Sequence, residues 1–183
     1  MRDWIETYTG KRIWIPPEDS NVYSVVDIAH SLANQCRYNG HCEFHYSVAQ
    51  HSMLVADCVP ENLKAFALLH DASESYCSDI PKPLKHQLKY YLKIEKAIQS
   101  DIYKQLLKRC PDKEEKAEIK HADTAVLLAE AAVIVRSGGV GWKHPEGMKP
   151  ADVEIKRELP DKIEKDFKRA IRSAVKNHMD NFV

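Results

Sequence analysis

The stretch ALLHDASESY, residues 67–76, holds three side chains that bind metal ions or transfer protons: His70, Asp71 and Glu74. In an α-helix each residue turns by about 100°, so these three side chains would share one arc of the helix surface. The bulky residues of the stretch would occupy the opposite side. Because a buried charge is costly unless it is paired or bound to a metal, the arc is either a solvated face or part of an active site.

Two residues elsewhere in the chain favour an active site that holds a metal ion. His51 stands in line with Leu54 and Val55 at helical spacing, which predicts that it faces inward. Asp123 precedes the apolar run TAVLLAEAAVIV and shares a helical face with Val126, so it also needs a partner. Two histidines and two aspartates would form a mixed nitrogen and oxygen site that suits Mn, Fe, Co or Zn better than Ca. Bound histidines must be neutral, so the affinity should fall in acid.

Helices are the elements that must position these side chains. The spacing of apolar residues and capping pairs such as Ser47 with Gln50 predict about six helices. These helices cover residues 25–38, 48–59, 61–77, 84–106, 113–135 and 161–180. Residues 1–20 contain two short β-prone runs, which predict a hairpin, and the glycine- and proline-rich segment 137–160 is typical of a loop or lid. We therefore expect a single, mostly α domain over residues 1–183.

Composition argues against several other classes of protein. The 27 basic and 27 acidic residues give a formal net charge of zero, so we expect neither a nucleic-acid polymer nor a membrane surface as partner. The five cysteines form no CxxC pair, which argues against a zinc ribbon and favours reduced thiols. No apolar run approaches the ~20 residues that span a bilayer, and no signal peptide is visible at the N-terminus. We expect a cytoplasmic protein.

The order His51, then His70 with Asp71, then Asp123 resembles the H…HD…D signature of the HD-superfamily metal-dependent phosphohydrolases. The motifs DIAHSLANQCRYNGH, YSVAQHS, LLHDASESY and DIPKPLK resemble those of short HD proteins of bacteria, prophages and phages, which are related to bacterial 5′-deoxynucleotidases and phage dATP triphosphohydrolases. The likeness extends from the hairpin to Asp123 and does not reach the region from Gly138 onward. It implies an HD-domain helical bundle with a short N-terminal β-hairpin, acting in a bacterial cell or a phage-infected host.

The resemblance gives the polar residues separate roles. It implies that His51, His70, Asp71 and Asp123 are ligands of a divalent metal ion, whose identity among Co, Mn, Zn, Fe and Mg is open. It makes Glu74 the group that orients or deprotonates the attacking water. Phosphate ester hydrolysis needs an activated nucleophile and charge stabilisation on the phosphoryl oxygens, and a divalent ion supplies both. Glu74 lies one helical turn after His70, close enough to take a proton from that water.

Five further residues are candidates for handling the substrate. The resemblance implies that Arg37 holds a phosphate oxygen through its planar fork and that Asp79 positions the water or the leaving group. Lys85 and Lys120 match positions that contact the outer phosphates of a triphosphate. Tyr38 could stack on the base. Residue type alone favours a surface cation for Arg37, packing for Tyr38 and solvation for the two lysines.

Together these residues imply a divalent-metal-dependent hydrolase of deoxynucleotide phosphates. It would release triphosphate from a dNTP or phosphate from a dNMP, and Lys85 and Lys120 favour the polyphosphate. Two alternatives stay open: a non-catalytic metal-binding or nucleotide-sensing HD module, and a cyclic-nucleotide or alarmone hydrolase on the same fold. The presence of Glu74, Asp79 and Arg37 argues against the sensing module. The expected partner is a small deoxynucleotide, and a homo-oligomer is a further expectation because such relatives often dimerise.

Overall fold

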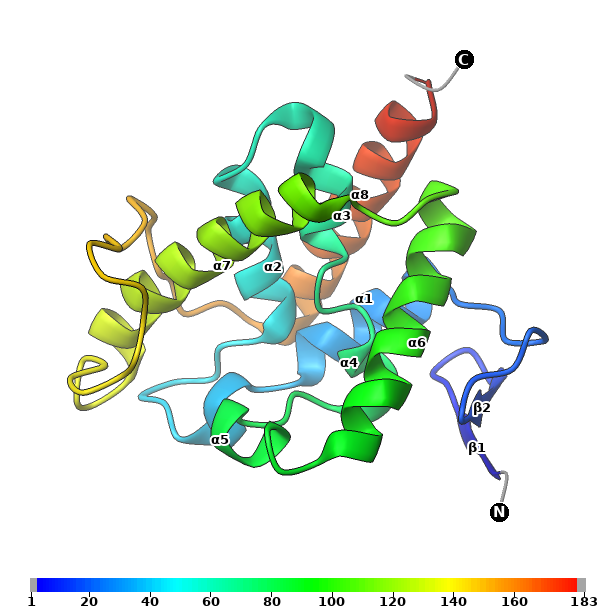
Figure 1. Ribbon diagram of the computed structural model, residues 1–183, viewed down its shortest axis with the longest axis horizontal. Helices are drawn as coiled ribbons and strands as arrows, with labels where there is room; N and C mark the ends of the chain where they lie inside the picture. The colour runs from blue at the N-terminus through cyan, green and yellow to red at the C-terminus, as the bar shows by residue number, and fades with distance from the viewer. Residues whose placement is uncertain (1–2, 181–183) are drawn as a thin grey trace.

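The computed structural model describes residues 3–180. Residues 1–2 of the predicted hairpin region and 181–183 of the predicted domain lie outside that range. In chain order the elements are β1 (Asp3–Glu6), β2 (Arg12–Ile15), α1 (Val25–Asn34), the 3₁₀ turn η1 (Arg37–Gly40), α2 (Val48–Asp57), the 3₁₀ turn η2 (Glu61–Leu63), α3 (Lys64–Leu68), α4 (Glu74–Cys77), α5 (Lys82–Lys85), α6 (Lys89–Leu107), α7 (Lys113–Ile134) and α8 (Pro160–Asp180) (Figure 1).

The prediction of a mostly helical chain with an N-terminal hairpin is confirmed. The expected number of about six helices is too low, because the described residues form eight α-helices. The predicted helix 25–38 ends at Asn34, and Arg37 and Tyr38 lie in the separate turn η1. Two further predicted helices are divided. Residues 61–77 form η2, α3 and α4, and residues 84–106 contribute to α5 and α6, with Leu88 in a non-helical conformation between them.

A side chain from a distant helix divides the predicted helix 61–77. In a continuous helix, the Ser73 amide would donate to the Leu69 carbonyl. Here the Gln99 amide of α6 takes both groups: its nitrogen donates to the Leu69 carbonyl at 2.7 Å, and its oxygen accepts from the Ser73 amide at 2.9 Å. A side chain inserted into the backbone ladder is a known cause of a helix break. The break falls at residues 69–73, which contain the His70-Asp71 pair.

The helices on either side of the candidate site begin as their capping pairs predict. At the start of α2, the Ser47 hydroxyl accepts from the Gln50 amide at 3.2 Å, and the Gln50 side chain accepts from the Ser47 amide at 3.1 Å. Asp112 and Glu115 form the same reciprocal pair at the start of α7, at 2.9 and 2.8 Å. Both capping boxes satisfy backbone donors that a helix start otherwise leaves unpaired.

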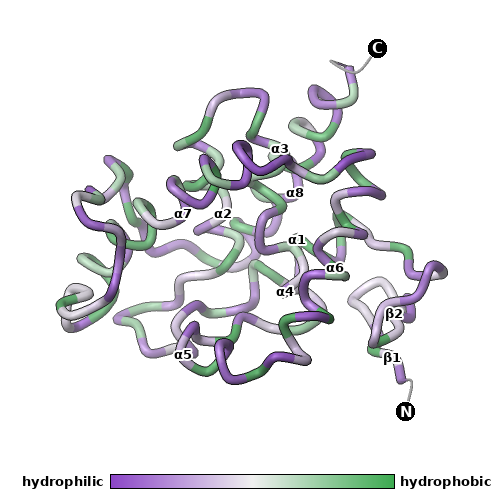
Figure 2. Tube along the Cα trace, viewed as in Figure 1, coloured by the Kyte–Doolittle hydropathy of each residue, from purple (hydrophilic) through white to green (hydrophobic). Residues whose placement is uncertain are grey.

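Helix α2 lies at the centre of the helical assembly. It packs against α1, α3, α7 and α8, so a residue on almost any face of α2 is shielded from water. The amphipathic helix α8 buries Ile163, Phe167 and Ile171 against this centre. Hydrophobic and hydrophilic residues alternate along the helices, as expected for elements with one buried face (Figure 2). His51, on α2, has no exposed surface.

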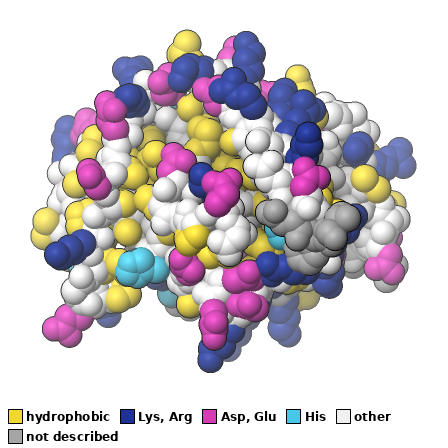
Figure 3. All heavy atoms as spheres, turned by 90° about the horizontal axis from the view of Figure 1, so that it is seen from above, with side chains coloured by type: hydrophobic (Ala, Val, Ile, Leu, Met, Phe, Trp, Pro, Cys, Tyr) yellow, Lys and Arg dark blue, Asp and Glu magenta, His cyan; other side chains and the backbone are white. Residues whose placement is uncertain are grey.

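The hairpin and the loop after α7 lie at opposite ends of the molecule (Figure 1). Strands β1 and β2 pair antiparallel, with a register that runs from Asp3 opposite Ile15 to Glu6 opposite Arg12. On the face drawn in Figure 3, acidic and basic side chains are interspersed rather than separated by sign. Within residues 3–180, no helix combines the length and the apolar composition needed to cross a membrane.

Replacing Gln99 tests the origin of the helix break. In Gln99→Ala, the Ser73 amide loses its partner and the Leu69 carbonyl keeps only the Ala72 amide, so we expect the free energy of unfolding to fall by about 1–3 kcal/mol. The measurement is urea denaturation, in which the midpoint should fall while the slope stays constant. The exposed Lys96→Ala on the same helix is the control and should change the midpoint little. Equal midpoints for the two variants would contradict this explanation.

Candidate metal centre

Three of the four predicted metal ligands form one cluster. His51 from α2 and the adjacent His70 and Asp71 from the break after α3 each offer an atom that could bind an ion, and these atoms lie within 4.8 Å of one another. The two imidazole rings are 5.3 Å apart between their centres. His51 is fully buried, whereas His70 and Asp71 are partly exposed. Solvent therefore reaches the cluster at His70 and Asp71 but not at His51.

Asp123, the fourth predicted ligand, reaches this cluster through His51. Its Oδ1 lies 3.0 Å from His51 Nε2, and α7 packs directly against α2. Lys120, one turn earlier on α7, donates to the other carboxylate oxygen. Lys120, predicted to contact phosphate, is thus engaged with a predicted metal ligand instead.

The hydrogen bonds of His70 define which of its nitrogens faces the cluster. Nδ1 lies 2.7 Å from the Ala67 carbonyl oxygen, which can only accept, so Nδ1 carries a proton. The neutral ring therefore has a lone pair on Nε2. This buried atom makes no hydrogen bond to any described residue, although Asp71 Oδ2 is only 3.1 Å away. Two acceptor atoms facing each other at this distance form a set that suits a cation.

Glu130 on α7 lies behind the cluster and has no exposed surface. Its Oε1 accepts from His51 Nδ1 at 2.8 Å, and its Oε2 accepts from the Tyr38 hydroxyl at 2.8 Å. Oε2 also lies 3.2 Å from Arg37 Nη2. Burial raises the pKa of Glu130, but the charges of Arg37 and His51 and the two hydrogen bonds outweigh it and lower the pKa to about 2. Glu130 is therefore ionised at neutral pH.

Sequence reasoning missed Glu130, although a signal for it was present. It is the one charged residue in the run TAVLLAEAAVIV, and it follows Asp123 by seven positions. Seven residues are two helical turns, so both carboxylates lie on one face of α7. A search for an isolated acidic residue in an apolar run, two helical turns from a predicted ligand, would have identified Glu130.

His51 sits between two carboxylates and holds a proton tightly. Burial and the nearby Arg37 guanidinium lower the pKa of this imidazole, but Glu130 and Asp123 together outweigh them. The pKa is raised from 6.5 to about 9. In the metal-free protein both ring nitrogens therefore donate, Nδ1 to Glu130 and Nε2 to Asp123. An ion that binds Nε2 must displace that proton.

Arg37 and Tyr38 lie in η1 beside the cluster. Arg37 is buried, so its interpretation as a surface cation is wrong. The prediction that Tyr38 stacks on a base stays a prediction. In this structure its hydroxyl is bonded to Glu130, and its ring packs against Trp142 of the predicted loop, with 5.9 Å between ring centres.

Glu74, the predicted base, is buried at the start of α4. Its Oε1 accepts from Lys85 Nζ at 3.1 Å, while its buried Oε2 makes no hydrogen bond within the described chain. Burial raises the pKa of Glu74, and the charges of Asp71 and Asp79 raise it further. Lys85 opposes these effects only in part, so the pKa lies well above the usual range of a glutamate.

Gln35, which follows α1, holds the predicted base Glu74 and the predicted positioning residue Asp79 at a set spacing. Its Nε2 donates to the Glu74 carbonyl at 3.0 Å, and its Oε1 accepts from the Asp79 amide at 3.2 Å. Asp79 is half-buried, and burial raises its pKa. Lys85 lies between Glu74 and Glu95, whose Oε1 is 2.6 Å from its Nζ. Neither Gln35 nor Glu95 was predicted from the sequence.

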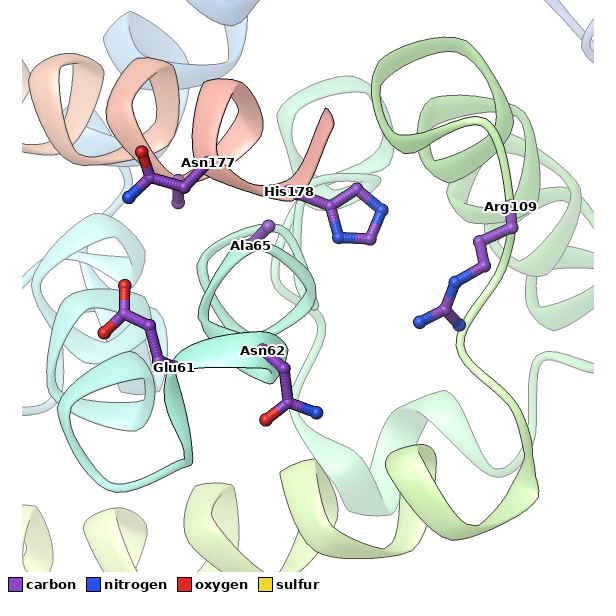
Figure 4. A pocket seen from close by; sticks show the side chains of 7 residues that line it. Glu61, Asn62, Ala65, Arg109, Asn177 and His178 are labelled. Atoms are coloured by element: carbon purple, nitrogen blue, oxygen red, sulfur yellow. The ribbon is translucent and has the colours of Figure 1, made fainter. Parts of the chain in front are cut away.

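A cavity of about 120 Å³ lies away from these residues (Figure 4). It opens between η2, α3, the C-terminal part of α8 and the segment after α6. Among the described residues its lining comprises Glu61, Asn62, Ala65, Arg109, Ala174, Asn177 and His178. None of these is a predicted site residue, so the cavity supplies matched controls for variants of the cluster.

The raised pKa of His51 predicts how the stability of the metal-free protein depends on pH. Because the folded pKa is about 9 and the unfolded value 6.5, the contribution is complete below pH 6.5 and is lost as pH rises through 9. The shift corresponds to about 3 kcal/mol. Urea denaturation with chelator should show this fall in the free energy of unfolding between pH 6.5 and 9, and His51→Gln should abolish it. The exposed His121→Gln should keep it; an unchanged pH slope in His51→Gln would contradict the assignment.

Comparison with known proteins identifies relatives but no family description. The chain matches no protein-family model. It is 36% identical over 145 residues to the uncharacterized protein YfdR of Escherichia coli strain K12, a match that covers 79% of this chain and 80% of YfdR. It is 31% identical over 144 residues to the uncharacterized protein RCAP_rcc00048 of Rhodobacter capsulatus, covering 73% of this chain and 74% of that protein. The chain therefore belongs to the same family as YfdR and its Rhodobacter relative.

Proposed function

We propose that the protein is a divalent-metal-dependent hydrolase that releases phosphate or triphosphate from deoxynucleotides. One observation carries the ion site: His70 Nε2 and Asp71 Oδ2 face each other at 3.1 Å without a hydrogen bond, while His70 Nδ1 is already taken by the Ala67 carbonyl. With His51 the donor set is two nitrogens and one carboxylate, which suits Mn, Fe, Co or Zn. An ion held there supplies an activated water nucleophile and charge stabilisation for a phosphoryl group.

Glu74 is the group that takes the proton from the attacking water. Its Oε2 is buried and accepts no hydrogen bond from residues 3–180, so one oxygen is available to the water. A carboxylate whose pKa is raised binds a proton more readily, which suits general-base chemistry near neutral pH. Gln35 keeps the backbones of Glu74 and Asp79 at a set spacing. A buried base beside the cluster, with one carboxylate oxygen free of hydrogen bonds from the described residues, favours hydrolysis over metal-dependent sensing.

Arg37 binds a phosphate oxygen of the substrate. Its Nη2 is held by Glu130, while its buried Nε makes no hydrogen bond in the described part of the chain. A buried N–H without a partner is uncommon, and a phosphate oxygen is a partner that matches a guanidinium. The neighbouring negative charges keep this guanidinium protonated, with its pKa above the usual value.

The length of the phosphate chain does not follow from the lysines. Lys85 is engaged by Glu74 and Glu95, and Lys120 by Asp123. A lysine neutralised by carboxylates is a weak reason to expect a polyphosphate, so the preference for a triphosphate loses its basis. Both dNMP and dNTP hydrolysis remain within the proposal, and the leaving group distinguishes them.

Removal of His70 tests the ion site without reference to activity. In His70→Ala the facing pair with Asp71 is gone, so we expect Co²⁺ affinity to fall by more than about 100-fold, beyond the 10–100-fold typical of residues that only support a ligand. The measurement is a Co²⁺ titration followed by visible absorbance. The exposed His121→Ala is the matched control and should bind Co²⁺ as the wild type does. Equal affinities in the two variants would remove the ion site from the proposal.

A substrate panel tests the reaction. Purified protein with Co²⁺, Mn²⁺, Zn²⁺, Fe²⁺ or Mg²⁺ is offered all dNMPs, NMPs, dNTPs and NTPs, and the released phosphate or triphosphate is identified. We expect deoxynucleotide turnover, and we expect Glu74→Gln to lower kcat by about 10²–10⁴-fold while Co²⁺ binding persists, because only the proton acceptor is lost. Glu61→Gln at the distant cavity should keep the wild-type kcat. Absence of turnover with every metal would overturn the hydrolase.

A further inference from the structure

Glu130 contacts a residue of the ion site with one oxygen and residues of the phosphate subsite with the other. Oε1 accepts from His51, and Oε2 accepts from Tyr38 beside Arg37. We infer that Glu130 is a positioning residue that joins the ion site and the phosphate subsite into one rigid unit. The inference rests on the proposed function, since the two subsites belong to it.

On the ion side, Glu130 determines the orientation of His51. The 2.8 Å hydrogen bond from Nδ1 to Oε1 fixes the rotation of the ring and keeps a proton on Nδ1. Nε2 then faces Asp123 at 3.0 Å and Asp71 at 4.0 Å. Carboxylates that accept from the second nitrogen of a histidine ligand orient the ring and raise its basicity. Glu130 thus acts on the ion through His51.

On the phosphate side, Glu130 holds the short turn η1. The Tyr38 hydroxyl donates to Oε2 at 2.8 Å, and the Arg37 guanidinium lies over the Tyr38 ring, 5.4 Å from its centre. Tyr38 and Asn39 both have left-handed backbone conformations, with φ of 57° and 52°. Such conformations persist in residues other than glycine when surrounding contacts hold them. Glu130 provides one of these contacts and anchors Arg37 by the same oxygen.

The first variant removes the charge of Glu130 but keeps its shape. In Glu130→Gln the amide cannot accept from His51 and from Tyr38 and Arg37 at once, because one of its two groups is a donor. We expect Co²⁺ affinity to fall by about 10–100-fold and the KM for the substrate to rise as well. The exposed Glu118→Gln on the same helix should change neither. A purely structural ion pair would lower the stability and leave the Co²⁺ affinity of the folded protein unchanged.

The second variant tests transmission across Glu130. Tyr38→Phe keeps the ring against Trp142 and removes only the hydroxyl that bonds Oε2, which lies on the side of the carboxylate away from His51. We expect a fall in Co²⁺ affinity of about two- to thirtyfold, the range over which residues without ligand contact modulate coupled sites. Tyr90→Phe, at an exposed tyrosine of α6, should have no effect.

The outcomes separate this inference from the proposed function. If folded Glu130→Gln binds Co²⁺ as tightly as the wild type, the inference is overturned and the hydrolase stands. If that variant does not fold, wild-type Co²⁺ affinity in Tyr38→Phe overturns the inference. A wild-type protein that binds Co²⁺ but hydrolyses no nucleotide overturns the hydrolase, while weaker Co²⁺ binding in both variants still supports Glu130 as the link. A wild-type protein that does not bind Co²⁺ overturns both.

Discussion

Glu130 keeps a negative charge at a position with no exposed surface, and a buried carboxylate costs several kcal/mol unless nearby groups compensate it. Its pKa of about 2 reflects that compensation by Arg37, His51 and Tyr38. These three partners come from η1 and α2, whereas Glu130 belongs to α7. The charge is therefore tolerable only if the three elements keep their relative positions. The same requirement aligns Asp123, two turns earlier on α7, with His51.

Local signals in the sequence predicted the helices that begin at capping pairs. Ser47 with Gln50 and Asp112 with Glu115 act within four residues, so nothing distant can easily override them. The break at residues 69–73, in contrast, is caused by a contact with a distant part of the chain. Its cause is Gln99, which lies 30 positions beyond Leu69. No pattern in the sequence around either residue predicts this hydrogen bond. The prediction that His70, Asp71 and Glu74 share one arc of a continuous helix was therefore wrong: His70 and Asp71 lie in the break, and Glu74 begins α4.

The candidate site divides in the same way. Residue type and the family resemblance pointed to His51, His70 and Asp71, and the fold brings these three together. Glu130 was missed because a run of alanine, valine and leucine predicts a helix face buried in the core. A single acidic residue within such a run does not change that prediction. The expectation that Lys85 and Lys120 contact phosphate gave too much importance to their charge. A sequence gives a lysine its charge but not its partner, and Lys85 has two carboxylates.

The carboxylates around the cluster differ in a way that supports separate chemical roles. Burial raises the pKa of each. At Asp123 the hydrogen bond and the charge of His51 outweigh burial and lower the pKa well below the usual range, so this carboxylate stays ionised as a ligand requires. The charge of His51 also lowers the pKa of Asp71. Glu74 has Asp71 as a neighbour and only Lys85 as a compensating partner, and its pKa is raised. Carboxyl groups whose environments drive their pKa values apart are suited to different tasks in one reaction. The division assigns ion binding to the two aspartates and proton transfer to Glu74, and it arises from position alone, since all three side chains carry the same functional group.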